Sequence, residues 1–279
     1  MIDRIGFMQG RLSPLVDGRI QAFPWSCWQD EFSAAEHHQF RLMEWTLDQE
    51  RLYENPLLTP AGQAEILYLR QKHGINILSL TGDCFMQSPF WKTGGSECLA
   101  LQNDFRAVAR ACSAVGISMI VLPLVDNGRL ETSAEEDFLV DVLQGEVKLL
   151  KELRVKVVFE SDFVPLELAR FIERLDPTLF GVNYDIGNSA SLGMNPTEEI
   201  GAYGHRIINV HIKDRMLGGT TVPLGAGNAD FEAVFAALAR AAYAGNYILQ
   251  TARAADGGHA TALCRYRDMA VGWINKYEA

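Results

Sequence analysis

The sequence lacks the cysteine spacing that forms a zinc site or a disulfide framework. Its cysteines are five in number and widely separated, and no Cys-x-x-Cys pair occurs. This distribution is typical of free thiols in a reducing compartment. The chain enters a strand-like pattern directly at Met1-Ile2-Asp3-Arg4, without the pattern of a signal peptide. We therefore expect a cytoplasmic protein.

The sequence also lacks a basic excess and a long apolar run. It has 25 Lys and Arg against 35 Asp and Glu, a formal net charge of −10. A nucleic-acid-binding protein needs clustered positive charge to neutralise phosphates, so we expect no nucleic-acid partner. A small anionic substrate is still allowed, because one local Arg or Lys is enough to bind it. No apolar run approaches the ~18 residues that cross a bilayer, so we expect no membrane partner.

A third missing feature is the dinucleotide fingerprint, since no Gly-x-Gly-x-x-Gly follows the first strand-like segment. What is present is a regular alternation of strand-like and helix-like segments along all 279 residues. The predicted strands are 2–8, 42–45, 75–80, 117–122, 155–160, 180–185, 207–211 and 247–250. The predicted helices are 33–40, 60–73, 97–115, 133–153, 165–175, 196–203, 230–244 and 259–273.

Start and stop residues support several of these helices. Ser33 with Glu36, and Ser133 with Glu136, have the spacing of capping boxes. The segments 9–30 and 81–96 have no clear period and are predicted to be loops. Eight strand–helix pairs in this length favour one (β/α)8 TIM barrel, a single domain spanning 1–279, over an open doubly wound sheet.

Four of the predicted strands end on a polar side chain that can ligate a metal: Glu160, Asp185, His211 and Gln250. In a (β/α)8 barrel the carboxyl ends of the strands form the active-site face. Oxygen and nitrogen donors without a thiolate suit Mn²⁺, Mg²⁺, Co²⁺ or Zn²⁺. One such residue is often only a helix cap or an ion-pair partner, but four successive strand ends predict a site for one divalent ion.

Other polar residues near the strand ends are candidates for substrate binding. Lys213 and Arg215 share a strand face with His211, because side chains alternate along a strand. Arg215 either binds substrate oxygens or a phosphate, or forms an ion pair with Asp214. Further candidates, each of which could instead cap a loop or form a turn, are Arg11, Glu44, Asp48, Asp83, Gly225 and Gly227. The backbone N–H groups of the two glycines could face a phosphate.

Four segments resemble the xylose-isomerase-like TIM-barrel family of sugar and sugar-phosphate isomerases and epimerases, in particular its hexulose- and L-xylulose-phosphate members. They are IGFMQGRLSP at 5–14, YDIGNS at 184–189, VHIKDR at 210–215 and LGAGNADF at 224–231. The resemblance covers nearly the whole chain. It implies a metal held by Glu, Asp, His and Glu at strands five to eight, with Gln250 in the place of the second Glu. It also implies a substrate contact at Asn188, in the sixth-strand motif.

The expected activity is therefore that of a divalent-metal-dependent isomerase or epimerase, EC class 5, with a small sugar or sugar phosphate as its partner. Glu160 is the candidate base that moves a proton to form an enediolate. An amide such as Gln250 can ligate a metal but cannot accept a proton. The pattern thus favours aldose–ketose isomerisation with one base over epimerisation with two.

Three other classes are left open. A metal-dependent sugar dehydratase or lyase begins with the same proton abstraction. A nuclease of the endonuclease IV type shares the predicted fold, but six histidines and the net charge of −10 count against it. A non-catalytic sugar-binding barrel is suggested by Gln250. A homo-oligomer is compatible with all of them.

Overall fold

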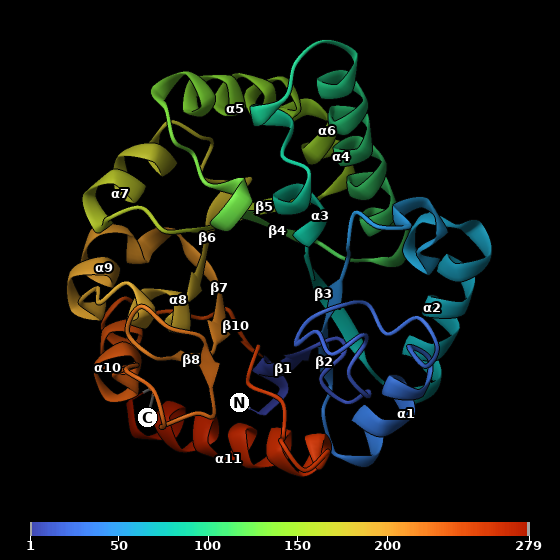
Figure 1. Ribbon diagram of the computed structural model, residues 1–279, viewed down its shortest axis with the longest axis vertical. Helices are drawn as coiled ribbons and strands as arrows, with labels where there is room; N and C mark the ends of the chain where they lie inside the picture. Colours follow the sequence, from blue (N-terminus) through green and yellow to red (C-terminus); the bar gives the residue numbers. More distant parts are fainter. Residues whose placement is uncertain (1, 278–279) are drawn as a thin grey trace.

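A computed structural model describes residues 2–277, and its centre is a closed barrel of eight parallel strands (Figure 1). The barrel strands are β1 (Ile5–Met8), β2 (Leu42–Thr46), β3 (Asn76–Thr81), β4 (Met119–Leu124), β5 (Lys156–Ser161), β6 (Phe180–Asp185), β7 (Ile207–Ile212) and β10 (Asn246–Leu249). Strand β10 pairs with both β7 and β1 and so closes the ring. The predicted fold, a single (β/α)8 barrel, is confirmed.

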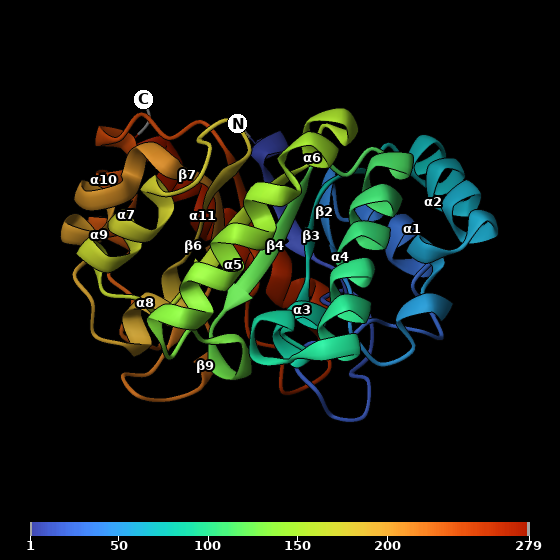
Figure 2. The same ribbon diagram turned by 90° about the horizontal axis from the view of Figure 1, so that it is seen from above.

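Most of the helices surround this ring on its outside (Figure 1). The helices of the described residues are α1 (Asp30–His37), α2 (Pro60–His73), α3 (Asp83–Gln87), α4 (Gly95–Val115), α5 (Ser133–Gly145), α6 (Val147–Leu153), α7 (Pro165–Glu173), α8 (Ile186–Ser191), α9 (Pro196–Tyr203), α10 (Phe231–Arg240) and α11 (His259–Tyr277). A short antiparallel hairpin, β8 (Asp214–Arg215) and β9 (Thr221–Val222), follows β7. Figure 2 shows α3, α8 and β9 at one end of the barrel, where the strands have their carboxyl ends.

The first predicted strand and the first predicted helix are wrong at their starts. Residues Ile2–Arg4 form a 3-10 helix, so the strand begins only at Ile5. Helix α1 begins at Asp30, and the hydroxyl of Ser33 donates to the carbonyl of Asp30 instead of capping the helix. Asp30 and Glu31 favour the earlier start, because acidic side chains stabilise the first turn of a helix.

The predicted helix 133–153 is two helices, α5 and α6, that meet at Gly145 and Glu146. Glycine lowers helix stability, which makes this a natural breaking point. The capping box is also shifted by one residue. It is formed by Thr132 and Glu135 in place of the predicted Ser133 and Glu136, and both of its hydrogen bonds are present. The predicted loop 81–96 contains α3 and a further 3-10 turn.

The barrel strands place large apolar side chains against the surrounding helices and point several polar side chains into the interior. On β5, Phe159 packs against Phe171 of α7 and Phe180 of β6, with ring centroids 5.1 Å and 6.3 Å away. The next residue, Glu160, points to the other face of the strand, because side chains alternate. The packing of Phe159 against α7 and β6 therefore fixes the position of β5, the strand that carries Glu160.

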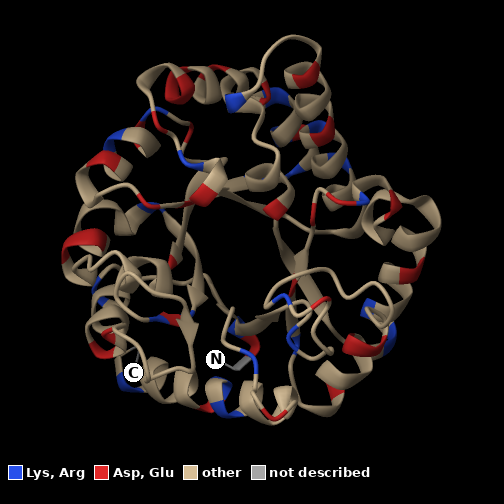
Figure 3. Ribbon diagram, viewed as in Figure 1, with Lys and Arg blue, Asp and Glu red and all other residues tan. Residues whose placement is uncertain are grey.

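Charged positions lie mainly on the outer helices, where acidic and basic residues are interspersed (Figure 3). Within residues 2–277, none of the helices combines the length and the apolar character that a bilayer crossing requires.

Truncation of Phe159 should destabilise the barrel strongly. We expect Phe159→Ala, at a position that is 0% exposed, to lower the free energy of unfolding by about 3–5 kcal/mol through loss of buried area and formation of a cavity. Phe138→Ala, at a position that is 38% exposed, is the matched control and should cost much less. Urea unfolding followed by circular dichroism measures both, and equal losses would contradict this packing.

Candidate metal centre

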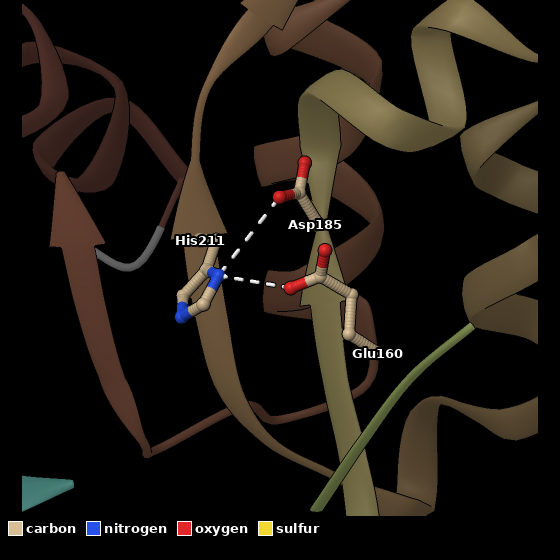
Figure 4. Close-up of side chains that lie close together, drawn as sticks. All are labelled: Glu160, Asp185 and His211. Carbon is tan, nitrogen blue, oxygen red and sulfur yellow. Dashed lines mark ion pairs between the residues drawn. The ribbon is translucent and has the colours of Figure 1, made fainter. Parts of the chain in front are cut away.

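Three potential metal ligands meet at the carboxyl end of the barrel. Glu160 lies near the end of β5, Asp185 ends β6, and His211 lies near the end of β7. Nδ1 of His211 is 3.2 Å from Oε2 of Glu160 and 3.8 Å from Oδ2 of Asp185 (Figure 4). The three side chains offer ligand atoms that all lie within 4.8 Å of one another. One divalent ion can therefore contact all three.

The imidazole of His211 presents a nitrogen that the protein does not satisfy. Nε2 lies 2.7 Å from Oε1 of Glu44, whereas Nδ1 is buried and makes no hydrogen bond. A buried polar atom without a partner is rare and costly. A metal ion bound by Nδ1, Glu160 and Asp185 would satisfy it, and this donor set suits Zn²⁺, Mn²⁺, Co²⁺ or Mg²⁺. The residues present thus fit a divalent ion.

Glu44 lies beneath His211, on the inner side of β2, and is fully buried. It accepts hydrogen bonds from Oγ of Ser79 at 2.6 Å and Oγ1 of Thr81 at 2.5 Å. The amide of Asn209 donates to it at 3.1 Å. A carboxylate that holds the second nitrogen of a ligating histidine fixes the ring and raises its basicity. Glu44, expected as a substrate contact, is placed by the structure to position His211.

Glu44 and His211 each stabilise the charged form of the other. Burial opposes ionisation of Glu44, but the charge of His211 and the surrounding hydrogen bonds outweigh burial and lower its pKa. For His211, burial is outweighed by the carboxylates of Glu44 and Glu160, which raise its pKa to about 10. Without a metal, the imidazole therefore carries the positive charge that balances these carboxylates.

Glu160 is held in place by two amides. Asn188 donates to its Oε1 at 2.5 Å, and Asn183 donates to its Oε2 at 3.1 Å. Burial opposes its ionisation, but the close approach and charge of His211, together with the charge of Lys213, lower its pKa. The side chain is thus a buried, oriented carboxylate at neutral pH. Asn188, an expected substrate contact, is one of the groups that orient it.

Lys213 brings an ammonium group to the edge of the centre. Its Nζ lies 3.3 Å from Oδ2 of Asp185, 3.2 Å from Oδ1 of Asn188 and 3.2 Å from Oε1 of Gln250. Burial raises the pKa of Asp185 more than the charge of Lys213 lowers it, and the charge of Glu160 adds to the increase. The oxygen of Gln250, predicted as a fourth ligand, therefore faces the ammonium group in this structure.

Arg215 lies on the hairpin that follows β7 and also reaches Asn188. Its Nη1 donates to Oδ1 of Asn188 at 2.9 Å, while Nε and Nη2 donate to the carbonyl of Gly219. The alternative partner, Asp214, is engaged elsewhere. Arg215 and Lys213 thus place two positive charges around one amide oxygen, close to the three ligands.

Asp214 organises the loop that contains the two glycines. Its Oδ2 accepts the N–H groups of Gly225 and Gly227, each at 2.9 Å, and its Oδ1 accepts that of Ala229 at 3.1 Å. A Cβ atom on Gly227 would lie 2.2 Å from Oδ1 of Asp214, so only glycine fits there. The two N–H groups, expected to face a phosphate, here hold a carboxylate of the chain.

A second hydrogen-bond network, built on Arg11 and Gln21, adjoins the centre. The guanidinium of Arg11 donates to the carbonyls of Thr251 and Ile20 and to Oε1 of Gln21, at 3.0, 2.9 and 3.3 Å. Gln21 donates in turn to Oδ2 of Asp83 at 2.5 Å. Arg11 is therefore buried and committed to the chain, where it ties the β1 loop to the end of β10.

Gln21 also connects this network to the metal centre, since Nε2 of Gln250 donates to Oε1 of Gln21 at 2.9 Å. Asp83, at the other end of the bridge, has a pKa raised to about 7, mainly by burial and by the charges of Asp48 and Glu160 against the hydrogen bond from Gln21. The centre is buried: Glu160 is 6% exposed, Asp185 5% and His211 0%.

Sequence reasoning missed the asparagines beside the ligands and the role of Gln21. Asn183 stands two residues before Asp185, and Asn209 two residues before His211. Because strand side chains repeat every second residue, this spacing places each asparagine on the inner face with the ligand that follows. That signal was available in the sequence. Gln21 lies in a loop without a period and offered none.

The geometry defines a class: a (β/α)8 barrel with a buried Glu–Asp–His centre at the carboxyl ends of its strands. The family model for the xylose isomerase-like TIM barrel matches residues 32–267. The chain belongs to this family, as its sequence motifs indicated.

Curated relatives include inosose dehydratases. That of Geobacillus thermodenitrificans is 27% identical, over 63% of this chain and 69% of the relative. That of Clostridium tetani is 31% identical, over 44% of this chain and 49% of the relative. The chain thus spans about half the length of the second relative.

Solved structures agree with the fold. An IOLI protein with a bound zinc atom has a TM-score of 0.75 at 17% identity, with 98% of each chain covered. An L-ribulose 3-epimerase has a TM-score of 0.74 at 14% identity, with 98% of this chain and 95% of the other covered. At such identities the likeness shows the shared barrel.

The centre predicts stoichiometric metal binding. We expect about one divalent ion per chain, removed by EDTA, and loss of that ion in the double variant Asp185→Ala/His211→Ala, because two of three ligands are gone. His73→Ala is the matched control, since His73 also contacts a glutamate, Glu36, at 2.7 Å but lies outside the centre. Elemental analysis and calorimetric titration with Mn²⁺ and Zn²⁺ measure occupancy. Full occupancy in the double variant would rule the centre out.

Proposed function

We propose that this protein is a divalent-metal-dependent enzyme that isomerises or epimerises a sugar or sugar phosphate. The observation that carries the proposal is the unsatisfied Nδ1 of His211, which faces two carboxylates in a buried centre at the active-site end of the barrel. The relatives and the shared barrel make a polyhydroxylated carbonyl compound the expected kind of substrate.

Such a reaction begins with removal of a proton from the carbon next to a carbonyl group. A bound divalent ion supplies Lewis-acid stabilisation of the developing negative charge. Glu160 is the proton acceptor: it is ionised, and the amides of Asn183 and Asn188 hold its carboxylate in one orientation. Preorganised groups of this kind lose little free energy to rearrangement during the reaction.

Lys213 supports the same step. Its ammonium group, held by Asp185, Asn188 and Gln250, lies at the edge of the centre. A positive charge there stabilises an enediolate and can donate a proton to one of its oxygens. In a buried site this electrostatic contribution is larger than in water.

The side chain at position 250 favours isomerisation over inversion of a centre. Gln250 offers an amide where the family pattern has a second glutamate, and an amide does not accept a proton. A 1,2-isomerisation can use Glu160 alone, because the proton returns on the face from which it left. Epimerisation at carbon 3 needs a second group on the opposite face, and Asp83 is the nearby carboxyl group available for that role.

Dehydration of an inosose-type substrate is the second candidate. Its support is the name of the curated relatives and the position of Lys213. Glu160 would remove the proton next to the carbonyl, the carbon–oxygen bond one carbon further would break, and Lys213 would protonate the departing hydroxide to give water. The enol left behind then becomes a ketone, so no oxidant or reductant is needed.

Replacement of Glu160 by glutamine should impair turnover while leaving the fold intact. We expect Glu160→Gln to lower kcat by about 10²–10⁴-fold at saturating Mn²⁺, as for loss of a general base. Glu167→Gln, at an exposed position on α7, is the control and should behave as wild type. The assay is interconversion of ketoses and aldoses, with and without phosphate. Turnover of Glu160→Gln at the wild-type rate would show that another residue is the general base.

The two candidate reactions differ in what happens to solvent deuterium and to water. For isomerisation in deuterated water, a ketose substrate should give an aldose with deuterium at carbon 2, and a ketose formed from an aldose should carry it at carbon 1. For dehydration, an inosose should lose 18 Da, which mass spectrometry detects directly. We expect the first pattern. Water loss without isomerisation would establish the second candidate instead.

A further inference from the structure

Glu199 is a buried carboxylate outside the metal centre. It lies in the first turn of α9 and is 3% exposed. Its partners are three hydroxyl groups: Oε2 accepts from Tyr184 at 3.0 Å and from Ser189, and Oε1 accepts from Tyr203 at 3.1 Å. Among the described residues, no positively charged side chain contributes to the pKa of Glu199, which burial raises against these hydrogen bonds. Burial of a carboxylate without a cation is costly. Glu199 thus differs from Glu146, which is also buried but pairs with an arginine.

The hydroxyl groups that bind Glu199 lie next to residues of the metal centre. Tyr184 directly precedes Asp185 on β6, and Ser189 directly follows Asn188 on α8. In the view of Figure 1, α8 lies between α9 and the barrel strands. This helix has six residues, too few to be stable without contacts to the rest of the chain. Glu199 therefore holds the outer side of a segment whose inner side carries Asp185 and Asn188.

The inner side of this segment sets the orientation of Glu160. Oδ1 of Asp185 accepts the backbone N–H of Asn188 at 2.8 Å and so caps α8. The side-chain amide of Asn188 donates to Oε1 of Glu160 at 2.5 Å. Lys213 packs closely against the same segment, because a Cβ atom on Gly187 would lie 2.6 Å from Cγ of Lys213. A shift of α8 would therefore move Asn188 and, with it, the carboxylate of Glu160.

The cavity beside Glu199 is too small for a substrate. Its volume is about 10 Å³, and its lining includes Asp185, Ser189 and Tyr203. A space of this size holds at most about one water molecule. Glu199 therefore does not touch a sugar bound at the metal centre, and it acts on the reaction only through the segment that it holds.

We infer that Glu199 is a positioning residue, which holds the β6–α8 segment so that Asn188 orients Glu160 for proton transfer. The inference rests on the proposed function, because it takes Glu160 as the proton acceptor. A displacement of about 1 Å at a reacting group can lower a rate by about 100-fold, even when the altered residue lies far from the chemistry. Loss of Glu199 should therefore lower kcat more than it raises KM, since the alignment for proton transfer changes while the surface that contacts the substrate does not.

Replacement of Glu199 by leucine tests this role. Glu199→Leu removes both acceptor atoms and should lower kcat by about 10- to 100-fold at saturating Mn²⁺, with KM changed by less than about threefold. Glu199→Gln should recover kcat to within about threefold of wild type, because an amide still forms hydrogen bonds with hydroxyl groups. The assay is interconversion of a ketose and an aldose. A readout without turnover is the visible absorption spectrum of the Co²⁺-loaded protein, which should change in Glu199→Leu and return in Glu199→Gln.

Glu146→Leu is the matched control. Glu146 is 8% exposed and accepts a hydrogen bond from Arg106 of α4 at 2.7 Å, among the outer helices. Its replacement should also lower the free energy of unfolding, measured with urea, but should leave kcat and the Co²⁺ spectrum unchanged. Equal losses of kcat in Glu146→Leu and Glu199→Leu would assign the effect to general destabilisation and overturn the inference.

Ser189→Ala provides a second test, which decides the matter even if Glu199→Leu does not fold. It removes one hydroxyl group on α8 and should lower kcat by about 3- to 10-fold, the size of one lost hydrogen bond. In the double variant Ser189→Ala/Glu199→Leu, the two effects on kcat should not multiply, because both substitutions break the same contact. Wild-type kcat in Ser189→Ala, or effects that multiply in the double variant, would overturn the inference.

The two readouts separate this inference from the proposed function. Sugar turnover by the wild type, with kcat and the Co²⁺ spectrum unchanged in Glu199→Leu, would contradict the positioning role alone. A Co²⁺ spectrum that changes in Glu199→Leu and returns in Glu199→Gln, in a protein without any sugar turnover, would support the hold of Glu199 on the metal centre and contradict the proposed function.

Discussion

The buried contact between Glu44 and His211 is the interaction on which the rest of the site depends. These residues are 167 positions apart in the chain and lie on β2 and β7, on different parts of the barrel wall. The contact fixes the imidazole so that Nδ1, and not Nε2, faces Glu160 and Asp185. Hydrogen bonds from Ser79 and Thr81 leave the carboxylate of Glu44 little freedom to turn. The barrel interior thus presents one oriented nitrogen to the two acidic ligands.

A hydrogen-bond network built on Arg11 and Gln21 borders the metal centre. Gln21 bridges Gln250 and Asp83 next to the centre, and Arg11 anchors the loop that carries Gln21. Exclusion of water strengthens the interactions among the buried charges.

The barrel could be predicted from the sequence because its signals are local. Apolar strand runs, helix stop signals at Gly74 and Gly116, and the polar strand ends all lie within short windows. The break between α5 and α6 was not predicted. The position of the cap was missed because Thr132 with Glu135 has the same spacing as the predicted pair, Ser133 with Glu136. The roles of Glu44, Gly225 and Gly227 could not be predicted, since each depends on a partner that only the folded chain brings near. For Asp214 the bound N–H groups lie 11 to 15 residues away.

We expect Glu160, Asp185 and His211 to hold one divalent ion, with His211 bound through Nδ1. Anomalous diffraction at the cobalt edge from crystals of the Co²⁺-loaded protein tests it most directly. We expect one strong peak at about 2.0–2.2 Å from Nδ1 of His211 and from a carboxylate oxygen of each acidic residue, with Nε2 still on Glu44. A peak on Nε2, a peak at another site, or no peak at this centre would contradict it.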